Sequence, residues 1–272
     1  YTMKQYYLLY ESEEIKDTLL FSFGFYGYME KLEGISTLFK NKVLTKTKFS
    51  TSNKPKLLMQ DAYYPTMISD KVVPNNISLK TNKLITGPNA SGKTTLLKTV
   101  TTNLLLSQQL GFGFYRKAKI TPFDYIHCYL NIPDTSSRDS LFQAEARRCL
   151  DIITTINNNR DKKHFCIFDE LFSGTNPYEA ISSAQSYLEY ISTIKNVRFM
   201  LTTHFIRLCS RLNTNKTIEN INMDTVITND IPCYKYKICS GISKIKGGIT
   251  VLKELGYPED IINRTKDIVT DF

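Results

Sequence analysis

The chain has 272 residues, 42% of them hydrophobic, with six cysteines and a formal net charge of +9. The length suits one large domain, or one domain with a small appendage, and the apolar content excludes wholesale disorder. No apolar stretch approaches the roughly 18 residues of a membrane span, the N-terminus is unlike a signal peptide, and the cysteines lack CxxC spacing; we therefore expect an intracellular protein (cytoplasm or nucleus) with no membrane partner and no secretion.

Three segments differ in composition along the chain. Residues 1–40 are rich in aromatic side chains and look partly helical. Residues 41–56 are rich in Lys, Thr and Ser, which predicts a loop and a boundary between domains. From residue 57 to residue 272, short apolar runs alternate with longer helical segments, a pattern typical of an α/β domain.

Three apolar runs in the α/β segment end on polar residues. These runs are residues 83–86, 164–168 and 198–203. The run 164–168 is almost continuously apolar, which predicts a strand buried on both faces. Polar residues at the carboxyl ends of parallel strands can face a ligand at the edge of a sheet. Further strands are predicted at residues 126–130, 225–228 and 234–238.

A glycine-rich loop follows the first run. Residues 87–94 fit the pattern GxxxxGK(S/T), in which glycines let backbone N–H groups surround phosphate oxygens. In this pattern Lys93 reaches the β- and γ-phosphates, and the Thr94 hydroxyl binds Mg²⁺. The position between a strand and a helix argues against a chance match, so the loop predicts ATP and Mg²⁺ as ligands. The predicted nucleotide contacts in this loop are Gly87, Pro88, Asn89, Ala90, Ser91, Gly92, Lys93, Thr94 and Thr95.

Polar residues also follow the other two runs. Asp169 is placed to hold Mg²⁺ together with Thr94, and Glu170 to activate the attacking water as general base. Alone, this acidic pair would be interpreted as an ordinary turn, but a phosphate loop upstream favours the functional interpretation. His204 is a candidate for contact with the γ-phosphate, although a lone histidine is usually structural. The predicted catalytic residues are therefore Lys93, Glu170 and His204.

Taken in order, these segments resemble the C-terminal ATPase domain of the MutS family of DNA mismatch-repair proteins. Residues 85–95 resemble its TGPNxxGKST loop, residues 168–175 its DEIGRGT segment and residues 201–205 its ATHY segment. Shorter pieces agree in order and spacing: residues 140–145 with STFMxE, 73–75 with VPND, 120–124 with IGPxD and 248–259 with the closing GIxVAxxAGxP. The resemblance covers roughly residues 28–272.

The resemblance implies a fold and a partner. The fold would be an α/β P-loop NTPase of the ABC-ATPase type, with a mixed, mostly parallel sheet flanked by helices, in residues 57–272. Residues 1–40 would be a short helical remnant of the lever or core domain. The partner would be a second MutS-like subunit, identical or paralogous, in a nucleotide-sandwich dimer. Ser140 would then act in trans on the partner's nucleotide, with Phe142 and Glu145 as its supports; Ser140 is equally suited to cap a helix, and both roles can hold together.

Departures from the family pattern concern the base and the dimer. Asn75 and Tyr236 are carried over as nucleotide contacts, with Tyr236 near an adenine site. Val72 falls where the family has an aromatic that stacks on adenine, and Val72 cannot stack. Ser173 replaces an Arg of DEIGRGT, which questions communication between subunits.

Contact with DNA is expected through domains outside this chain. The family's mismatch-reading domain has no counterpart here, and its long DNA-clamping levers have at most a remnant in residues 1–40, so no residue is assigned to base contact. Nine of the 35 basic residues are Arg, so 26 are Lys, and the first hundred residues contain no Arg. A compositional bias toward Lys therefore explains the net charge at least as well as a path for double-stranded DNA does.

The sequence thus predicts the ATP-binding and ATP-hydrolysing module of a MutS-like mismatch-repair protein that couples ATP state to DNA clamping. One alternative is a nucleotide-dependent dimerisation module with little hydrolysis. The other is a different ABC-type ATPase, SMC-like or from a transporter, which the lack of an LSGGQ-like signature disfavours.

Overall fold

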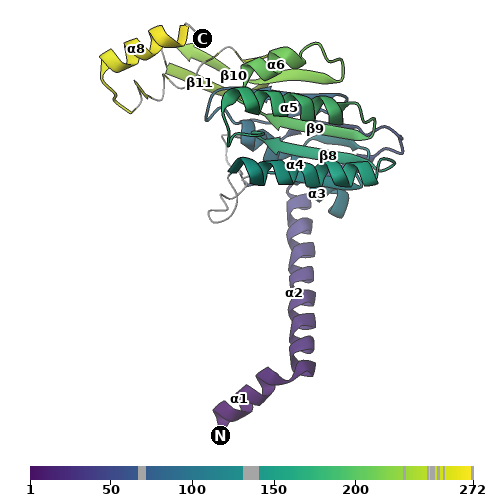
Figure 1. Ribbon diagram of the computed structural model, residues 1–272. Helices are drawn as coiled ribbons and strands as arrows, with labels where there is room; N and C mark the ends of the chain where they lie inside the picture. Colours follow the sequence, from purple (N-terminus) through teal and green to yellow (C-terminus); the bar gives the residue numbers. More distant parts are fainter. Residues whose placement is uncertain are drawn as a thin grey trace. The chain divides into compact units, whose positions relative to one another are not determined.

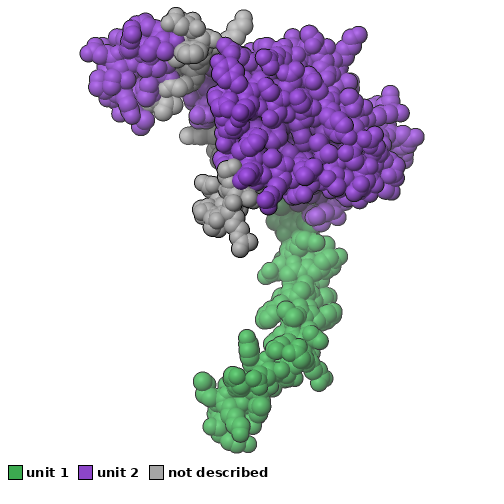
Figure 2. Space-filling view, viewed as in Figure 1, with its two compact units in different colours: residues 1–45 green, residues 46–272 purple. Residues whose placement is uncertain are grey.

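The computed structural model describes residues 1–66, 72–130, 141–228, 231–243, 245, 249, 252–253 and 255–270. Two compact units divide the chain, residues 1–45 and residues 46–272, drawn in green and purple in Figure 2. Within the described ranges, none of the helices has the length and apolar character that crossing a bilayer requires.

The first unit is formed by two helices, α1 (Thr2–Glu11) and α2 (Glu13–Lys40). Ser12 between them has extended backbone, with φ −70° and ψ 117°, and Glu13 and Glu14 in the first turn of α2 complement its dipole. Neither helix buries a side chain, and large apolar residues such as Phe21, 74% exposed, face solvent. Residues 2–40 are therefore more completely helical than the sequence suggested. Their assignment to a lever domain stays a prediction.

The loop predicted for residues 41–56 is wrong at its centre, where strand β1 (Thr45–Phe49) forms. β1 pairs in parallel with β6 (Lys117–Ile120), with Thr47 opposite Ala118. Lys and Thr alternate in β1 with a period of two, and β-branched Thr favours extended backbone. Lys, Thr and Ser content suggested a loop, whereas the alternation of the same residues was a strand signal.

The second unit contains two sheets, where the sequence predicted one mostly parallel sheet. Its other strands are β2 (Leu57–Ala62), β3 (Asn75–Ser78), β4 (Asn82–Thr86), β5 (Phe112–Gly113), β7 (Tyr125–Tyr129), β8 (His164–Asp169), β9 (Val197–Thr202), β10 (Ile218–Thr228) and β11 (Ile231–Ser240). The five-stranded sheet has the order β3-β2-β6-β1-β5, and the six-stranded sheet has the order β11-β10-β4-β9-β8-β7. In the six-stranded sheet only β10 and β11 pair antiparallel among the described strands. The six strands predicted from apolar runs all lie within this sheet.

Helices cover the six-stranded sheet on both faces (Figure 1). They are α3 (Lys93–Leu110), α4 (Leu141–Asn158), α5 (Pro177–Ser192) and α6 (Ile206–Leu212); α8 (Glu259–Thr270) lies near the C-terminus. Apolar side chains of α4, α5 and α6 form one core with one face of the sheet. Apolar side chains of α3 form a second core with the opposite face and with the inner face of the five-stranded sheet, so α3 lies between the two sheets.

Strand β8 shows why the sheet is buried on both sides. Phe165 and Ile167 belong to the core around α3, whereas Cys166 and Phe168 belong to the core around α4 and α5, and all four are 0% exposed. Burial of each such large side chain stabilises the fold by about 1.5–3 kcal/mol relative to exposure. The strand is thereby fixed in position, and Asp169 and Glu170 emerge at its carboxyl end.

Candidate functional site

The candidate site lies at the carboxyl ends of β4, β8 and β9. These three strands are parallel neighbours, and Thr202 of β9 is paired with Ile85 on one side and with Asp169 on the other. Because parallel strands end at the same edge, the structure brings together the glycine-rich loop, the acidic pair and His204, as the sequence predicted.

The glycine-rich loop is tight at its two ends. Gly87 has φ 153°, and a Cβ built on it would come within 2.7 Å of Ser91 Oγ. Gly92 has φ 97° at the N-cap of α3, and its Cβ would come within 3.2 Å of the Tyr236 ring. Only glycine adopts these conformations at little cost and leaves this space. Ala90 also has positive φ, 62°, which completes the turn.

Lys93 is the first residue of α3 and points back into the loop. Its ammonium donates to the carbonyl oxygens of Gly87 at 3.0 Å and Pro88 at 3.1 Å, and the residue is 7% exposed. Burial lowers the pKa of the Lys93 ammonium, while the nearby charges of Glu170 and Asp169 act in the opposite direction. The N–H groups of the first helical turn lack partners within the helix and carry partial positive charge. The loop and this turn therefore suit phosphate oxygens.

Asp169 is held by hydroxyl groups. Thr94 Oγ1 lies 3.0 Å from Asp169 Oδ2, and the Thr202 hydroxyl donates to Asp169 Oδ1. Across the described residues no group of three or more His, Cys, Asp or Glu side chains could hold a metal. A site with one carboxylate and one hydroxyl fits Mg²⁺, which is commonly held by few protein oxygens and completed by phosphate and water.

Glu170 is fixed by its backbone and by His204. Its φ is 57°, and its N–H donates to the Thr202 carbonyl at 3.1 Å. His204 Nε2 lies 2.7 Å from Glu170 Oε1, with the two side chains 40% and 42% exposed. The hydrogen bond from His204 lowers the pKa of the Glu170 carboxyl, and the positive charges of His204 and Lys93 lower it further against partial burial. Glu170 therefore remains ionised and open to solvent.

A pocket of about 570 Å³ extends from these groups. Part of its lining is formed by loop and α3 residues, with Glu170 and His204. Of the residues predicted in the loop, Asn89, Ala90, Gly92, Lys93, Thr94 and Thr95 line it. Gly87, Pro88 and Ser91 shape the turn from outside this lining. Ser91 is 0% exposed, and its hydroxyl has no hydrogen-bond partner among the described residues.

The rest of the pocket lining is mainly apolar and aromatic, and part of it lies against the loop, since a Cβ on Gly92 would be 3.2 Å from the Tyr236 ring. This part of the lining includes Ala62, Tyr63, Tyr64, Val72, Val73, Met223 and Tyr236. Val72 lies there as the resemblance implied. Tyr63 and Tyr64 were not predicted from the sequence, where their only signal is a pair of aromatic residues directly after a strand. Tyr63 is anchored by its carbonyl, which accepts from Asn103 Nδ2 at 3.0 Å, and by its ring, which packs edge-on against Phe114.

Asn75 places Tyr236 at the pocket. Its amide nitrogen donates to the Tyr236 carbonyl at 2.8 Å, and its oxygen accepts from the Ile238 N–H at 2.9 Å. Tyr236 has φ 53° and also lines the pocket. Asn75 therefore both lines the pocket and joins β3 to β11.

Glu145 connects α4 to the segment after Glu170. Its carboxylate accepts from the N–H and hydroxyl of Ser173 at 3.0 and 2.9 Å and from the Gly174 N–H at 3.1 Å, and it is 2% exposed. A Cβ on Gly174 would lie 2.7 Å from the Phe142 backbone nitrogen, so α4 begins in contact with this segment. Glu145 thus fixes Ser173, the residue that replaces the family's Arg. Ser140 lies outside the described residues.

Comparison with known proteins identifies relatives. Residues 83–272 match the family model described as MutS domain V. A DNA mismatch repair protein MutS of Persephonella marina is 27% identical over 220 residues, which cover 79% of this chain and 25% of that protein. The MutS proteins of Leptospira interrogans and Bacillus subtilis are each 27% identical, over 94% and 89% of this chain and 32% and 28% of their own lengths. The chain therefore spans about a quarter to a third of the length of the curated relatives it matches.

Proposed function

Since this chain belongs to the MutS family through its domain V, we propose that it binds and hydrolyses ATP in a MutS-like DNA mismatch-repair protein. The observation that carries the proposal is one pocket lined by Lys93, Thr94 and Glu170 together with aromatic residues, with Asp169 bonded to Thr94 beside it. A basic loop beside an apolar wall suits a nucleoside triphosphate, with the phosphates at the loop and the base at the wall.

The phosphate end divides into binding and reacting groups. The Lys93 ammonium, now held by two loop carbonyls, would turn to the β- and γ-phosphates. Thr94 and Asp169 would hold Mg²⁺, which supplies charge neutralisation on the phosphate oxygens. The His204 side chain holds Glu170 and would sense the γ-phosphate.

Hydrolysis would use Glu170 as general base. Water attacks the γ-phosphorus, the bond to the β–γ bridging oxygen breaks, and the water proton passes to Glu170. The left-handed backbone and the 2.7 Å contact with His204 fix the carboxylate in place, and its lowered pKa keeps it ready to accept a proton.

The fold and assembly we infer are those of an ABC-type P-loop ATPase in a nucleotide-sandwich dimer. Each site would be closed in trans by the start of α4 and Ser140 of a second MutS-like subunit, identical or paralogous. Different affinities for ATP and ADP would shift the dimer between closed and open states. Domains outside this chain would then clamp double-stranded DNA, and an intracellular location follows from that substrate.

The test is steady-state ATP turnover of the chain beside Glu170→Gln, over a series of protein concentrations. We expect turnover per chain to rise with concentration, and to fall by about 10²–10⁴-fold in Glu170→Gln because a positioned base contributes that much. ATP binding, measured by calorimetry, should remain in the variant. Glu189→Gln removes the same charge from an exposed position on α5 and is the matched control.

Two results would contradict the proposal in different ways. Equal turnover in Glu170→Gln and the parent would remove Glu170 as base. ATP-dependent dimerisation without turnover in either would favour a dimerisation module, the alternative that Ser173 and Val72 suggest.

A further inference from the structure

The outer face of the five-stranded sheet carries four lysines side by side. β1 and β6 pair in parallel, with Lys48 opposite Lys119 and Thr47 opposite Ala118. Ala118 is 2% exposed and faces the core around α3, so Lys48 and Lys119 face outward. Side chains alternate along a strand, so the residues two positions earlier share this side. The lysine face is therefore Lys46, Lys48, Lys117 and Lys119, all of them exposed.

The four charges are close to one another. Alternate residues of a strand are about 6.6–6.8 Å apart, and neighbouring strands are about 4.7–4.9 Å apart. Four ammonium groups therefore project from a patch about 1 nm across. Like charges directly opposite each other across a strand pair are destabilising.

Nothing on the described part of the sheet neutralises these charges. The outward residues of β2 beside them are uncharged, because Leu58 is opposite Lys119 and Gln60 is opposite Lys117. The acidic residue of β2, Asp61, is already paired with Arg116 at 2.6 Å. Throughout the ranges that the structure describes, the four lysines make no ion pair or side-chain hydrogen bond.

We propose that the lysine face binds the phosphate backbone of duplex DNA. The proposal rests on the proposed function in one respect, that DNA is the macromolecule on which the whole protein acts. A flat, rigid cluster of cations matches a dense line of phosphates, whose release of counterions drives binding. None of the four lysines lines the nucleotide pocket, so this surface is separate from the ATP site.

The chemistry of the lysine face favours binding to the DNA backbone over recognition of DNA bases or binding to a lipid surface. Lysines act as point charges and lack the forked geometry that reads base edges, so binding should be independent of sequence. Membrane-binding surfaces combine basic residues with exposed apolar anchors. Here the outward neighbours on β2 and β3 are Leu58, partly buried, Gln60 and Ser78.

The test measures binding of the 272-residue chain to a labelled 25-base-pair duplex by fluorescence anisotropy between 50 and 200 mM salt. The variant is Lys46→Gln, Lys48→Gln, Lys117→Gln and Lys119→Gln together. We expect the slope of log K against log salt to become shallower by about 4, which is about 1 for each lysine that no longer meets a phosphate. The control neutralises four exposed lysines elsewhere, Lys4, Lys40, Lys195 and Lys216, and should keep the parent slope.

Thermal unfolding distinguishes weaker DNA binding from a failure to fold. Removing mutual repulsion should leave the melting temperature of the quadruple variant equal to or above that of the parent. If the quadruple variant does not fold, Lys48→Gln with Lys119→Gln should still reduce the slope, by about 2.

Three outcomes would overturn the proposal: no duplex binding by the parent, an unchanged slope in the folded variant, or equal binding to phosphatidylserine vesicles. Failure of the ATPase proposal would show elsewhere, as absent turnover with lysine-dependent DNA binding intact. ATP turnover without lysine-dependent DNA binding would refute this inference alone.

Discussion

At the scale of single residues, the pair of Glu170 and His204 governs the chemistry of the site. Glu170 has its pKa lowered chiefly by the hydrogen bond from His204, and the proximity of Lys93 adds to this. A carboxyl with a lowered pKa stays ionised down to more acidic pH than usual, and its contribution to stability is lost only as the pH falls through that lowered value. The proposed base therefore stays ionised at a more acidic pH than an ordinary glutamate does.

Replacing His204 with Ala should shift this limit. Without the hydrogen bond, the Glu170 carboxyl returns toward its usual pKa, so the acid limb of turnover moves to higher pH. The measurement is the pH profile of kcat for ATP in the parent and in His204→Ala, with ATP saturating. An acid limb at the same pH in both would show that His204 does not set the ionisation of Glu170.

Residues in motifs could be found from the sequence, because their spacing reflects contact with one ligand. Lys93, Asp169, Glu170 and His204 all lie at one sheet edge as predicted, while their chemical roles stay predictions. Tyr63 and Tyr64 could not be found, since a tyrosine pair after a strand has no pattern that distinguishes a pocket wall from a packed core. The contacts of Glu145 with Ser173 join positions 28 residues apart, and no local rule predicts them.

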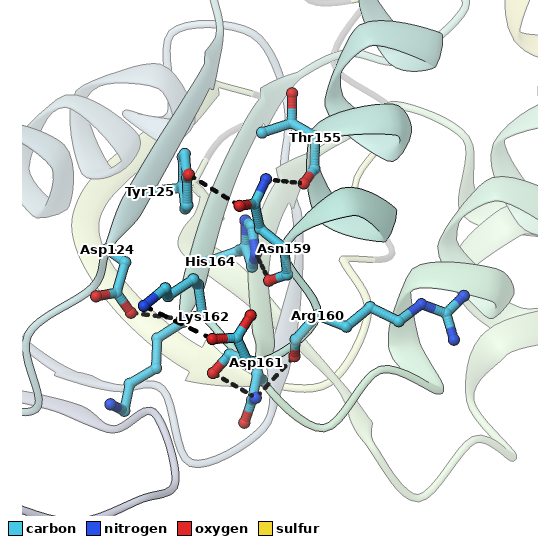
Figure 3. A network of polar contacts seen from close by, with 10 residues as sticks. Asp124, Tyr125, Thr155, Asn159, Arg160, Asp161, Lys162 and His164 are labelled. Atoms are coloured by element: carbon cyan, nitrogen blue, oxygen red, sulfur yellow. Dashed lines mark hydrogen bonds and ion pairs between the residues drawn. The ribbon is translucent and has the colours of Figure 1, made fainter.

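At the scale of elements, strands β7 and β8 are joined by a pair of histidines as well as by their backbones. His127 Nε2 lies 3.0 Å from His164 Nδ1, and His164 Nε2 donates to the Asn159 carbonyl at 2.9 Å. Figure 3 shows His164 and Asn159 within a polar network, in which Tyr125 donates to the Asn159 side chain at 3.2 Å. Burial, reinforced by the charges of His164 and Arg148, lowers the pKa of His127 to about 4.

Because of His127, the free energy of unfolding should decrease as the pH is lowered through a defined range. The pKa of His127 is about 4 in the folded chain against the ordinary histidine value of 6.5, so between these values the unfolded chain binds a proton that the folded chain does not. We expect the free energy of unfolding to decrease as pH falls from 6.5 to 4.5, by at most about 3 kcal/mol for the whole shift. His127→Asn should flatten this dependence in urea titrations.

The carboxyl groups with lowered pKa, Glu170 and Glu219, act below this window, since their contribution is lost only under pH 4.5. An equally steep decrease in His127→Asn would exclude His127 as its source.

Predictions of elements succeeded where burial imposes a pattern. The apolar runs of β4, β8 and β9 identified strands because both faces of each are covered. β1 has exposed lysines on one side, and on the other Thr45 and Thr47 are only partly buried while Phe49 is exposed, so the lysine, threonine and serine content of the segment masked the alternation. The division into two sheets could not be predicted, because strand pairing depends on contacts distant in sequence, such as Thr47 with Ala118.

At the scale of the whole molecule, the two units differ in how they are stabilised. Residues 46–272 contain both hydrophobic cores, whereas α1 and α2 bury no side chain. The stability of the second unit therefore resides in its own contacts. Leu44, which lies just before the boundary between the two units, is itself buried, with 8% of the residue exposed.

Removal of residues 1–40 should leave the second unit folded. We expect the melting temperature to change by less than about 4 °C, which corresponds to under about 1 kcal/mol, and the affinity for ATP to remain that of the parent. Differential scanning calorimetry and ATP titration of the truncated chain provide the measurement. A large loss of stability would mean that α2 contributes contacts essential to the second unit.

The pocket walls belong to different sheets, and this has a mechanical consequence. Tyr64 follows β2 and Asn75 lies on β3 of one sheet, whereas Glu170 follows β8 and Met223 and Tyr236 lie on β10 and β11 of the other. The side-chain amide of Asn75 joins the two sheets, because both its oxygen and its nitrogen form hydrogen bonds with the backbone of β11. A molecule seated in the pocket would contact residues of both sheets at once, in addition to the core around α3 that already joins them. A smaller occupant would therefore lose contacts with both sheets together.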